Sequence, residues 1–349
     1  MIEKLIDLCA RNKFLVILFT MVGVGYGLYS MKRVPLDALP DLSDTQVIVY
    51  SKWDRSPDII EDQVTYPIVT SLLGAPKVKA IRGFSDFGFS YVYVIFEEGT
   101  DVYWARSRVL EYLSKITPLL PNDVTTELGP DASGVGWVFQ YALVDKTGQN
   151  DLAQLRSFQD WYLRYWIQSV PGVAEVASIG GFQRQYQVNI NPNALQSYNI
   201  PIMKVVDAIR SGNNDVGGRL VELSGAEYMV RGRGYAKSVD DLENIVVGLD
   251  MKGTPVLVRN VADVTLGPDI RRGIVDLDGM GDTVGGIVVM RYGENALNVI
   301  DRVKSKLEEI KPSLPPGVEI IPTYDRSDPV SYTHLRAHET KANLVCRLL

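Results

Sequence analysis

The chain begins with a strongly apolar segment and continues with alternating strand-like and helix-like patterns. Residues 14–31 form a run of 18 residues without a charged side chain. Because an α-helix rises 1.5 Å per residue, such a run nearly crosses a hydrocarbon core of about 30 Å. Before it, apolar residues recur at helical spacing, at Ile2, Leu5, Ile6 and Cys9. The pattern predicts one transmembrane helix over 14–31 and an amphipathic lead-in over 1–13.

A cleavable signal peptide is the alternative interpretation of this segment. The run is long for the apolar part of a signal peptide, and neither Gly27-Leu28-Tyr29 nor Tyr29-Ser30-Met31 is a good small-x-small cleavage site. We therefore favour an uncleaved anchor. The glycines of the run follow no strand, so they indicate helix packing and not a nucleotide-binding loop.

Residues 42–133 predict the order β-α-β-β-α-β. Alternation with a period of two marks the strands, and apolar residues three or four positions apart mark the helices. The predicted strands are 45–52, 78–85, 90–96 and 124–128, and the predicted helices are 57–74 and 101–116. This order is the split motif of a ferredoxin-like domain.

The same order starts again near residue 136 but is interrupted. A strand at 136–144, a helix at 151–168 and a strand at 173–179 are followed much later by strands at 274–277, 283–292 and 318–322 and a helix at 296–310. Between them, 181–271 predicts a further α/β unit with strands at 186–190 and 227–232 and helices at 202–211 and 239–244. The fold class is therefore α+β with one N-terminal transmembrane helix and two ferredoxin-like domains. The second comprises 134–180 and 272–325 and is split by the insert 181–271.

Two details of the second domain follow from this pattern. Its strands 136–144 and 283–292 are expected in one sheet although about 140 residues separate them. On the helix 151–168, helical spacing predicts a buried face of Leu152, Leu155, Phe158, Tyr162 and Tyr165. The aromatic stretch Trp161-Tyr162 and Tyr165-Trp166 could instead be a platform for a substrate, but its helical spacing favours a buried helix face.

The composition excludes several classes of protein. Apolar residues make up 46% of the 349 residues and charged residues 22%, as in a globular protein. The net charge of -6 argues against a nucleic-acid binder, which usually carries a basic excess. Two cysteines cannot form a disulfide framework.

The last twenty residues, 330–349, resemble a translated sequencing adapter and are excluded from the fold. Both histidines of the chain, His334 and His338, lie in this tail, as does Cys346. An apparent metal pair of these histidines is therefore rejected. We expect the natural protein to continue beyond residue 329, which makes this chain a fragment.

Enzymatic chemistry finds little support in 1–329. A Ser-His or Cys-His pair is impossible without a histidine, and no phosphate-binding Gly-x-x-x-x-Gly-Lys-Ser/Thr loop is present. The acidic pairs Glu97-Glu98 and Asp240-Asp241 are typical of turns and helix ends. The eight methionines are dispersed, so packing in the core or against lipid explains them better than a soft-metal site. We predict no catalytic, cofactor-binding or metal-binding residue and no enzymatic activity.

Several sequence strings together carry a resemblance to a known family. They are Pro35-Leu36-Asp37-Ala38-Leu39-Pro40-Asp41, Gln63-Val64-Thr65-Tyr66-Pro67, Arg82-Gly83-Phe84-Ser85, Tyr103-Trp104-Ala105-Arg106-Ser107-Arg108, Glu127-Leu128-Gly129-Pro130-Asp131, Arg271-Arg272-Gly273-Ile274 and Thr323-Tyr324-Asp325-Arg326-Ser327. In this order they resemble the N-terminal third of a heavy-metal efflux pump of the resistance–nodulation–division superfamily. The resemblance is closest to the CusA-like copper/silver branch, with the CzcA-like cobalt/zinc/cadmium branch next.

The resemblance implies a trimeric, proton-driven antiporter of the bacterial inner membrane. Such a pump has periplasmic porter subdomains and a docking subdomain, and it works with a periplasmic adaptor and an outer-membrane channel. This would make 42–133 porter subdomain 1, 134–180 with 272–325 porter subdomain 2, and 181–271 the docking subdomain. The proton relay and metal ligands of the family lie outside this chain, so no site residue is carried over.

A second hypothesis is a self-contained, membrane-anchored periplasmic binding or assembly module. It would share the anchor and the α/β domains. The gene beyond codon 329 discriminates the two, because further membrane spans there indicate a pump and a stop codon indicates a module.

Overall fold

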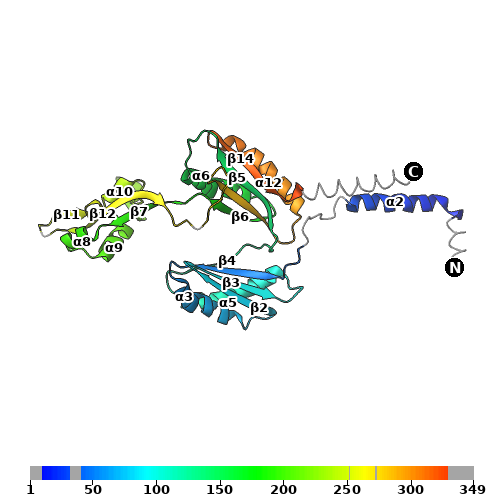
Figure 1. The fold of residues 1–349 in the computed structure, drawn as a ribbon, viewed down its shortest axis with the longest axis horizontal. Helices are drawn as coiled ribbons and strands as arrows, with labels where there is room; N and C mark the ends of the chain where they lie inside the picture. Colours follow the sequence, from blue (N-terminus) through cyan, green and yellow to red (C-terminus); the bar gives the residue numbers. More distant parts are fainter. Residues whose placement is uncertain (1–9, 32–40, 251, 272, 329–349) are drawn as a thin grey trace. The chain divides into compact units, whose positions relative to one another are not determined.

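The computed structural model describes residues 10–31, 41–250, 252–271 and 273–328 (Figure 1). Most of the predicted lead-in and the whole predicted adapter tail lie outside these residues. The described residues form two compact units. The first takes its residues from 1–149, 158–179 and 283–349, and the second from 150–157 and 180–282.

The N-terminal helix α2, Lys13–Met31, agrees with the apolar run in the sequence. Its window Lys13–Ser30 has a mean hydropathy of 1.5, and none of this window is buried. Large side chains such as Phe14, Phe19 and Tyr26 are exposed. Within the described ranges, α2 is the one helix long and apolar enough to cross a membrane.

The first four-stranded sheet has the order β2-β3-β1-β4 and is antiparallel at each pair. Its strands are β1 Gln46–Lys52, β2 Val78–Asp86, β3 Phe89–Phe96 and β4 Thr125–Leu128. The helical segments are α3 Pro57–Ile60, η1 Glu61–Thr65, α4 Tyr66–Leu72, α5 Val102–Ile116 and η2 Thr117–Leu119. Alternate residues of β1 and β3, such as Val49 and Val94, pack against Ile68 and Val109 of the helices. Pro57 begins the first helix, and the Asp101 side chain caps α5 by accepting from the Trp104 amide.

The second four-stranded sheet has the order β14-β5-β13-β6. Its strands are β5 Trp137–Asp145, β6 Val173–Gly180, β13 Val284–Met290 and β14 Val318–Asp325. The helical segments are α6 Leu152–Phe158, η3 Gln159–Leu163, α7 Arg164–Gln168, α12 Ala296–Ile310 and η4 Lys311–Ser313. The predicted long-range pairing of β5 with β13 is confirmed, with Val284 opposite Leu143. In both sheets the first strand along the chain lies between the third and the fourth.

The strand predicted at 274–277 is wrong. Ile274 is 72% exposed, and residues 274–282 contain only an isolated bridge between Asp276 and Asp282. Positive φ angles at Asp278, Gly279 and Gly281 turn the backbone in this stretch. The stretch contains too few apolar residues to form a paired strand, and the turn-forming residues that follow determine its backbone conformation.

The buried face predicted for the helix 151–168 is largely wrong, because a π-helical turn interrupts the helix. A π-turn holds more residues than an α-turn, so residues four apart remain on one face. The side chains buried along that face are Leu155, Gln159, Leu163 and Ile167. Of the five residues predicted to be buried, only Leu155 is, and Tyr165 is 56% exposed.

A similar π-turn, η1, interrupts the first helix of the other sheet. Each π-turn places a polar side chain in the core, where hydroxyl groups of the sheet satisfy it. The Thr65 hydroxyl lies 2.8 Å from Ser85 Oγ and 2.7 Å from Ser90 Oγ. The Gln159 side chain accepts from Tyr141 Oη at 2.9 Å and donates to Ser178 Oγ at 3.3 Å. Because Gln159 is a polar residue at a buried position, it hid the buried face of the helix 151–168 from the hydrophobic pattern, whereas in the first helix Val64 and Ile68 beside Thr65 are buried apolar residues at helical spacing.

The second unit is built on a long antiparallel pair, β7 Arg184–Ile190 with β12 Ala262–Pro268. Its other elements are α8 Pro192–Tyr198, α9 Ile202–Gly212, β8 Leu220–Leu223, β9 Ala226–Met229, α10 Val239–Glu243, β10 Val246–Leu249, β11 Pro255–Leu257 and α11 Val258–Val261. Val205, Val258 and Val264 lie in its core. The predicted strand 227–232 is shorter than expected, and α8, β8, β10, β11, α11 and β12 were not predicted.

Candidate functional site

The residues with metal-binding chemistry are dispersed. Groups of three or more His, Cys, Asp or Glu that could hold a metal ion do not occur among the residues that the structure describes. Met203, Met229 and Met280 are 58%, 80% and 90% exposed, so the expectation of core or lipid packing is wrong for these three. Met290 is buried in β13, as the expectation of core packing requires. The exposed three occur in the second unit, where short elements leave little core.

The acidic pair Asp240-Asp241 has a structural explanation. It opens α10, where the Ser238 and Asp241 side chains form a reciprocal capping box. Hydrogen bonds from the Lys237 amide and from Ser238 hold the pKa of Asp241 below its usual value. A carboxylate used in this way satisfies free amides of the helix, as the sequence interpretation of the pair expected.

The aromatic residues of η3 and α7 lie on the surface instead of forming the predicted buried face. Trp161 is 70% exposed and Trp166 is 42% exposed. The rings of Phe158 and Tyr162 stack at 5.0 Å, and Lys306 Nζ lies 4.5 Å from the centre of the Trp166 ring. The π-turn explains the exposure, because it turns the residues spaced by four toward the sheet and the aromatic residues outward.

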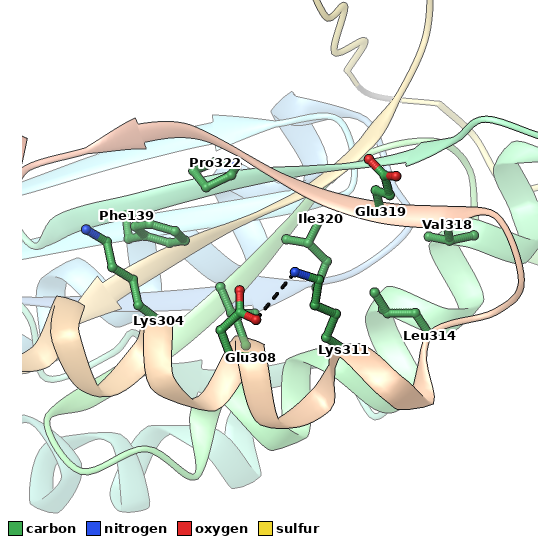
Figure 2. A pocket seen from close by; sticks show the side chains of 10 residues that line it. Phe139, Lys304, Glu308, Lys311, Leu314, Val318, Glu319, Ile320 and Pro322 are labelled. Atoms are coloured by element: carbon green, nitrogen blue, oxygen red, sulfur yellow. Dashed lines mark hydrogen bonds and ion pairs between the residues drawn. The ribbon is translucent and has the colours of Figure 1, made fainter.

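A cavity of about 520 Å³ lies between α12 and the edge strand β14 (Figure 2). Its apolar wall consists of Phe139, Leu307, Leu314, Val318, Ile320 and Pro322. Figure 2 shows Lys304 and Glu308 on α12 facing Val318, Glu319 and Ile320 on β14.

Each charged residue that lines the cavity has an ion-pair partner. Lys304 pairs with Asp325, Lys311 Nζ lies 3.4 Å from Glu308, and Glu319 lies 2.6 Å from Lys146 Nζ. Because the charges are neutralised in pairs, the cavity is suited to contact with an apolar surface and poorly suited to a bare cation. Its lining residues lie within 304–322 except for Phe139, and no local sequence pattern shows that a cavity forms between this helix and this strand.

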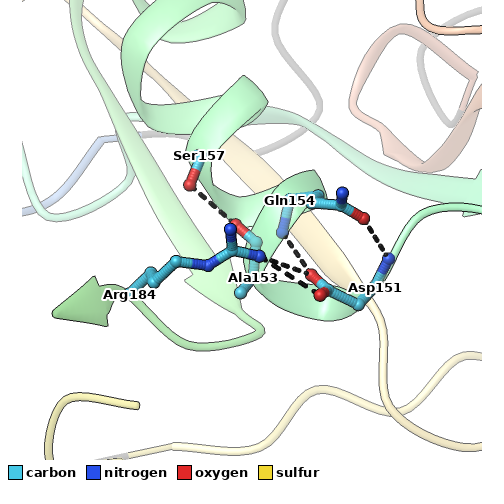
Figure 3. Close-up of polar contacts among 5 residues, drawn as sticks. All are labelled: Asp151, Ala153, Gln154, Ser157 and Arg184. Atoms are coloured by element: carbon cyan, nitrogen blue, oxygen red, sulfur yellow. Dashed lines mark hydrogen bonds and ion pairs between the residues drawn. The ribbon is translucent and has the colours of Figure 1, made fainter. Parts of the chain in front are cut away.

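A polar cluster at the start of α6 lies within the second unit (Figure 3). Asp151 accepts from the Gln154 amide at 2.7 Å, and the Gln154 side chain accepts from the Asp151 amide at 2.8 Å. Arg184, the first residue of β7, donates to both carboxylate oxygens of Asp151, at 3.2 and 3.3 Å. Both partners are substantially exposed, so the ion pair stabilises by at most about 1 kcal/mol and mainly orients the chain.

Comparison with known proteins assigns the family. The family model described as the AcrB/AcrD/AcrF family matches residues 5–345. The chain is 52% identical over 328 residues to the cation efflux system protein SilA of Salmonella typhimurium and to the cation efflux system protein CusA of Escherichia coli (strain K12). Each alignment covers 94% of this chain and 31% of the relative.

More distant relatives give the same picture. The cobalt-zinc-cadmium resistance protein CzcA of Cupriavidus metallidurans is 36% identical over 335 residues. A crystal structure of a heavy-metal efflux pump superposes with a TM-score of 0.83 at 32% identity and covers 93% of this chain and 32% of the pump chain. The chain thus spans about a third of the length of these relatives. It is more similar to CusA and SilA than to CzcA, and it belongs to the AcrB/AcrD/AcrF family of efflux proteins.

Proposed function

We propose that this chain is the N-terminal third of a proton-driven transporter that exports heavy-metal cations, with copper or silver as the substrate. The observation that carries the proposal is the 52% identity to SilA and CusA over nearly the whole chain. The lower identity to CzcA supports the choice of copper or silver over cobalt, zinc or cadmium.

The two sheets support a division into porter subdomains. Both consist of four strands in the same order, with one helical region interrupted by a π-turn and a second helix of 15 residues, as expected of ferredoxin-like domains. We assign 42–133 to porter subdomain 1, 134–180 with 272–325 to porter subdomain 2, and 181–271 to a docking subdomain. The compact second unit, which contains 180–282, supports the last assignment.

The proposed setting is the bacterial inner membrane, with α2 as the first membrane helix and the bulk of the chain in the periplasm. The complete protein would form a homotrimer and work with a periplasmic adaptor and an outer-membrane channel. Such a pump needs a metal path and a proton path, which we place in the two thirds of the relatives that this chain does not span. The chain alone is therefore expected to transport nothing.

Metal tolerance of an efflux-deficient bacterial host tests the proposal. The chain alone should leave copper and silver tolerance unchanged. The gene completed from the natural source, together with adaptor and channel genes, should raise it, and adaptor and channel without the pump are the control. Tolerance conferred by the chain alone would contradict the proposal. Tolerance to zinc or cobalt alone would reassign the substrate.

A further inference from the structure

Three segments that are distant in sequence meet at one place in the first unit. They are Asp41–Ser43, where the described chain resumes after α2, Ser133–Val135, which connects the two sheets, and Asp325–Ser327, which follows β14. The first segment follows α2 along the chain, and the second is the link between the sheets. A fixed contact here would therefore hold the residues that follow α2 against the link between the two sheets.

Arg326 lies at the centre of this meeting point. It is 1% exposed and is the largest side chain that is fully buried among the described residues. Its backbone amide donates to the Val138 carbonyl at 3.0 Å, and its Nη1 donates to the Val135 carbonyl. A buried guanidinium is costly unless it is paired and hydrogen-bonded, so its retention at this position needs an explanation.

Asp41 provides the opposite charge from the segment that follows α2. Its carboxylate accepts from the Ser43 amide at 3.1 Å and from the Ser43 and Ser133 hydroxyl groups. Burial raises the pKa of Asp41, but these hydrogen bonds and the positive charge of Arg326 outweigh it, so the net pKa is lowered. A Cβ atom added to Gly134 would lie 3.7 Å from Ser43 Cβ, which shows that the two segments touch.

The third segment is itself fixed to α12. Asp325 pairs with Lys304 of α12 and accepts from the Ser327 amide at 2.8 Å. Lys304 Nζ also donates to Ser327 Oγ at 3.3 Å. Arg326 thus projects from a segment fixed to α12 and donates to Val135 of the second segment, while the Ser133 hydroxyl of that same segment donates to Asp41 of the first.

We propose that Arg326 is a positioning residue, and that with Asp41, Ser43, Ser133 and Val135 it forms a tether that fixes the chain following α2 to the link between the two sheets. Through this tether the chain from Asp41 onward is held to both sheets. Its role in transport rests on the proposed function, whereas its presence is a property of this chain.

Distance measurements between spin labels test the tether in the full chain, reconstituted in lipid nanodiscs. Leu42 and Ser313 are exposed and lie in the same unit, so spin labels can be attached after Leu42→Cys and Ser313→Cys. Cys9→Ser and Cys346→Ser remove the two natural cysteines so that only these positions are labelled. Arg326→Met should widen the distance distribution at least twofold, and Arg326→Lys should restore much of the narrow distribution. Arg156→Met is the matched control, because Arg156 also donates to a carbonyl, that of Gly180, but belongs to the second unit, and it should change nothing.

Asp41→Asn and Ser133→Ala keep the test decisive if Arg326→Met fails to fold, because both alter the tether without touching the sheet cores. Each should widen the distribution. An unchanged distribution in these folded variants would overturn the proposal. If the tether is present but the completed protein exports no metal, the proposed function is contradicted and the tether proposal stands.

Discussion

Two adjacent glycines in β13 show how tightly the second sheet is packed. A Cβ atom at Gly285 would lie 2.3 Å from the Tyr141 carbonyl oxygen, and one at Gly286 would lie 2.4 Å from Tyr141 Oη. Contacts this short require something to move. The carbonyl is part of the backbone and has less freedom than a ring, so Gly285 is the less tolerant of the two.

Gly285→Ala should therefore destabilise the protein by about 1–3 kcal/mol, the usual cost of overpacking. Thermal unfolding of the purified chain measures the effect. Gly74→Ala is the control in the same unit, because a Cβ there meets nothing within 4 Å. Equal unfolding temperatures for the two variants would show that the sheet adapts at Gly285.

Asp325 makes stability depend on pH at the end of β14. Burial raises its pKa, but hydrogen bonds from Lys304 and Ser327 outweigh burial and lower it below 3.8. A carboxyl with a lowered pKa stabilises the folded state at pH values above its unfolded pKa, and this contribution is lost as the pH falls through the folded pKa.

Asp325→Asn should consequently lower the unfolding temperature near neutral pH, and the difference from the parent should shrink between about pH 5 and pH 2. Unfolding followed by circular dichroism across this range measures it. Asp123→Asn, at an exposed loop position, is the control. A difference that stays constant down to the lowest pH would assign the effect to packing and not to charge.

Elements with strong periodicity were predictable from the sequence, and those that depend on distant contacts were not. The helix 296–310 was predicted with the bounds of α12 because its apolar residues keep a regular helical spacing. The π-turns were missed because Thr65 and Gln159 are polar residues at buried positions. The α12–β14 cavity and the Arg326 tether combine segments more than 100 residues apart, which no local pattern reveals.

The insert should be removable from the second sheet. β6 ends at Gly180 and β13 begins at Val284, and at their other ends the Arg291 amide donates to the Gly172 carbonyl at 2.8 Å. The two strands thus run as an antiparallel hairpin whose connection has been replaced by the insert.

Replacing 181–282 by Asn-Gly, a favoured two-residue hairpin turn, should therefore preserve the pairing of β5 with β13. Hydrogen exchange of the β13 amides measures this pairing, and cooperative unfolding should persist. Val288→Asp in the shortened chain is the control, because Val288 is fully buried and the variant should lose protection. Rapid exchange in the shortened chain itself would show that the sheet needs the insert to form.

At the scale of the whole molecule, we predict that α2 anchors the chain in the membrane and that the residues after it lie in the periplasm. If α2 is an uncleaved anchor, a reporter fused after residue 130 should be active in the periplasm and remain in the membrane after a carbonate wash. The same fusion without 14–31 should stay in the cytoplasm. Release of a shortened protein would identify α2 as a cleaved signal peptide instead.

The split of the second sheet also sets the order in which it is assembled. Roughly 100 residues separate the end of β6 from the start of β13, and synthesis proceeds at about 5–20 residues per second. Since β6 pairs only with β13 in the described sheet, it waits about 5–20 seconds with open hydrogen-bonding edges; β5 pairs with β13 and β14 and ends about 140 residues before β13, so it waits about 7–28 seconds. During that interval the insert has time to fold first. Aggregation through the exposed edges is therefore greatest while translation crosses the insert, and a chaperone that shields β5 then would raise the yield.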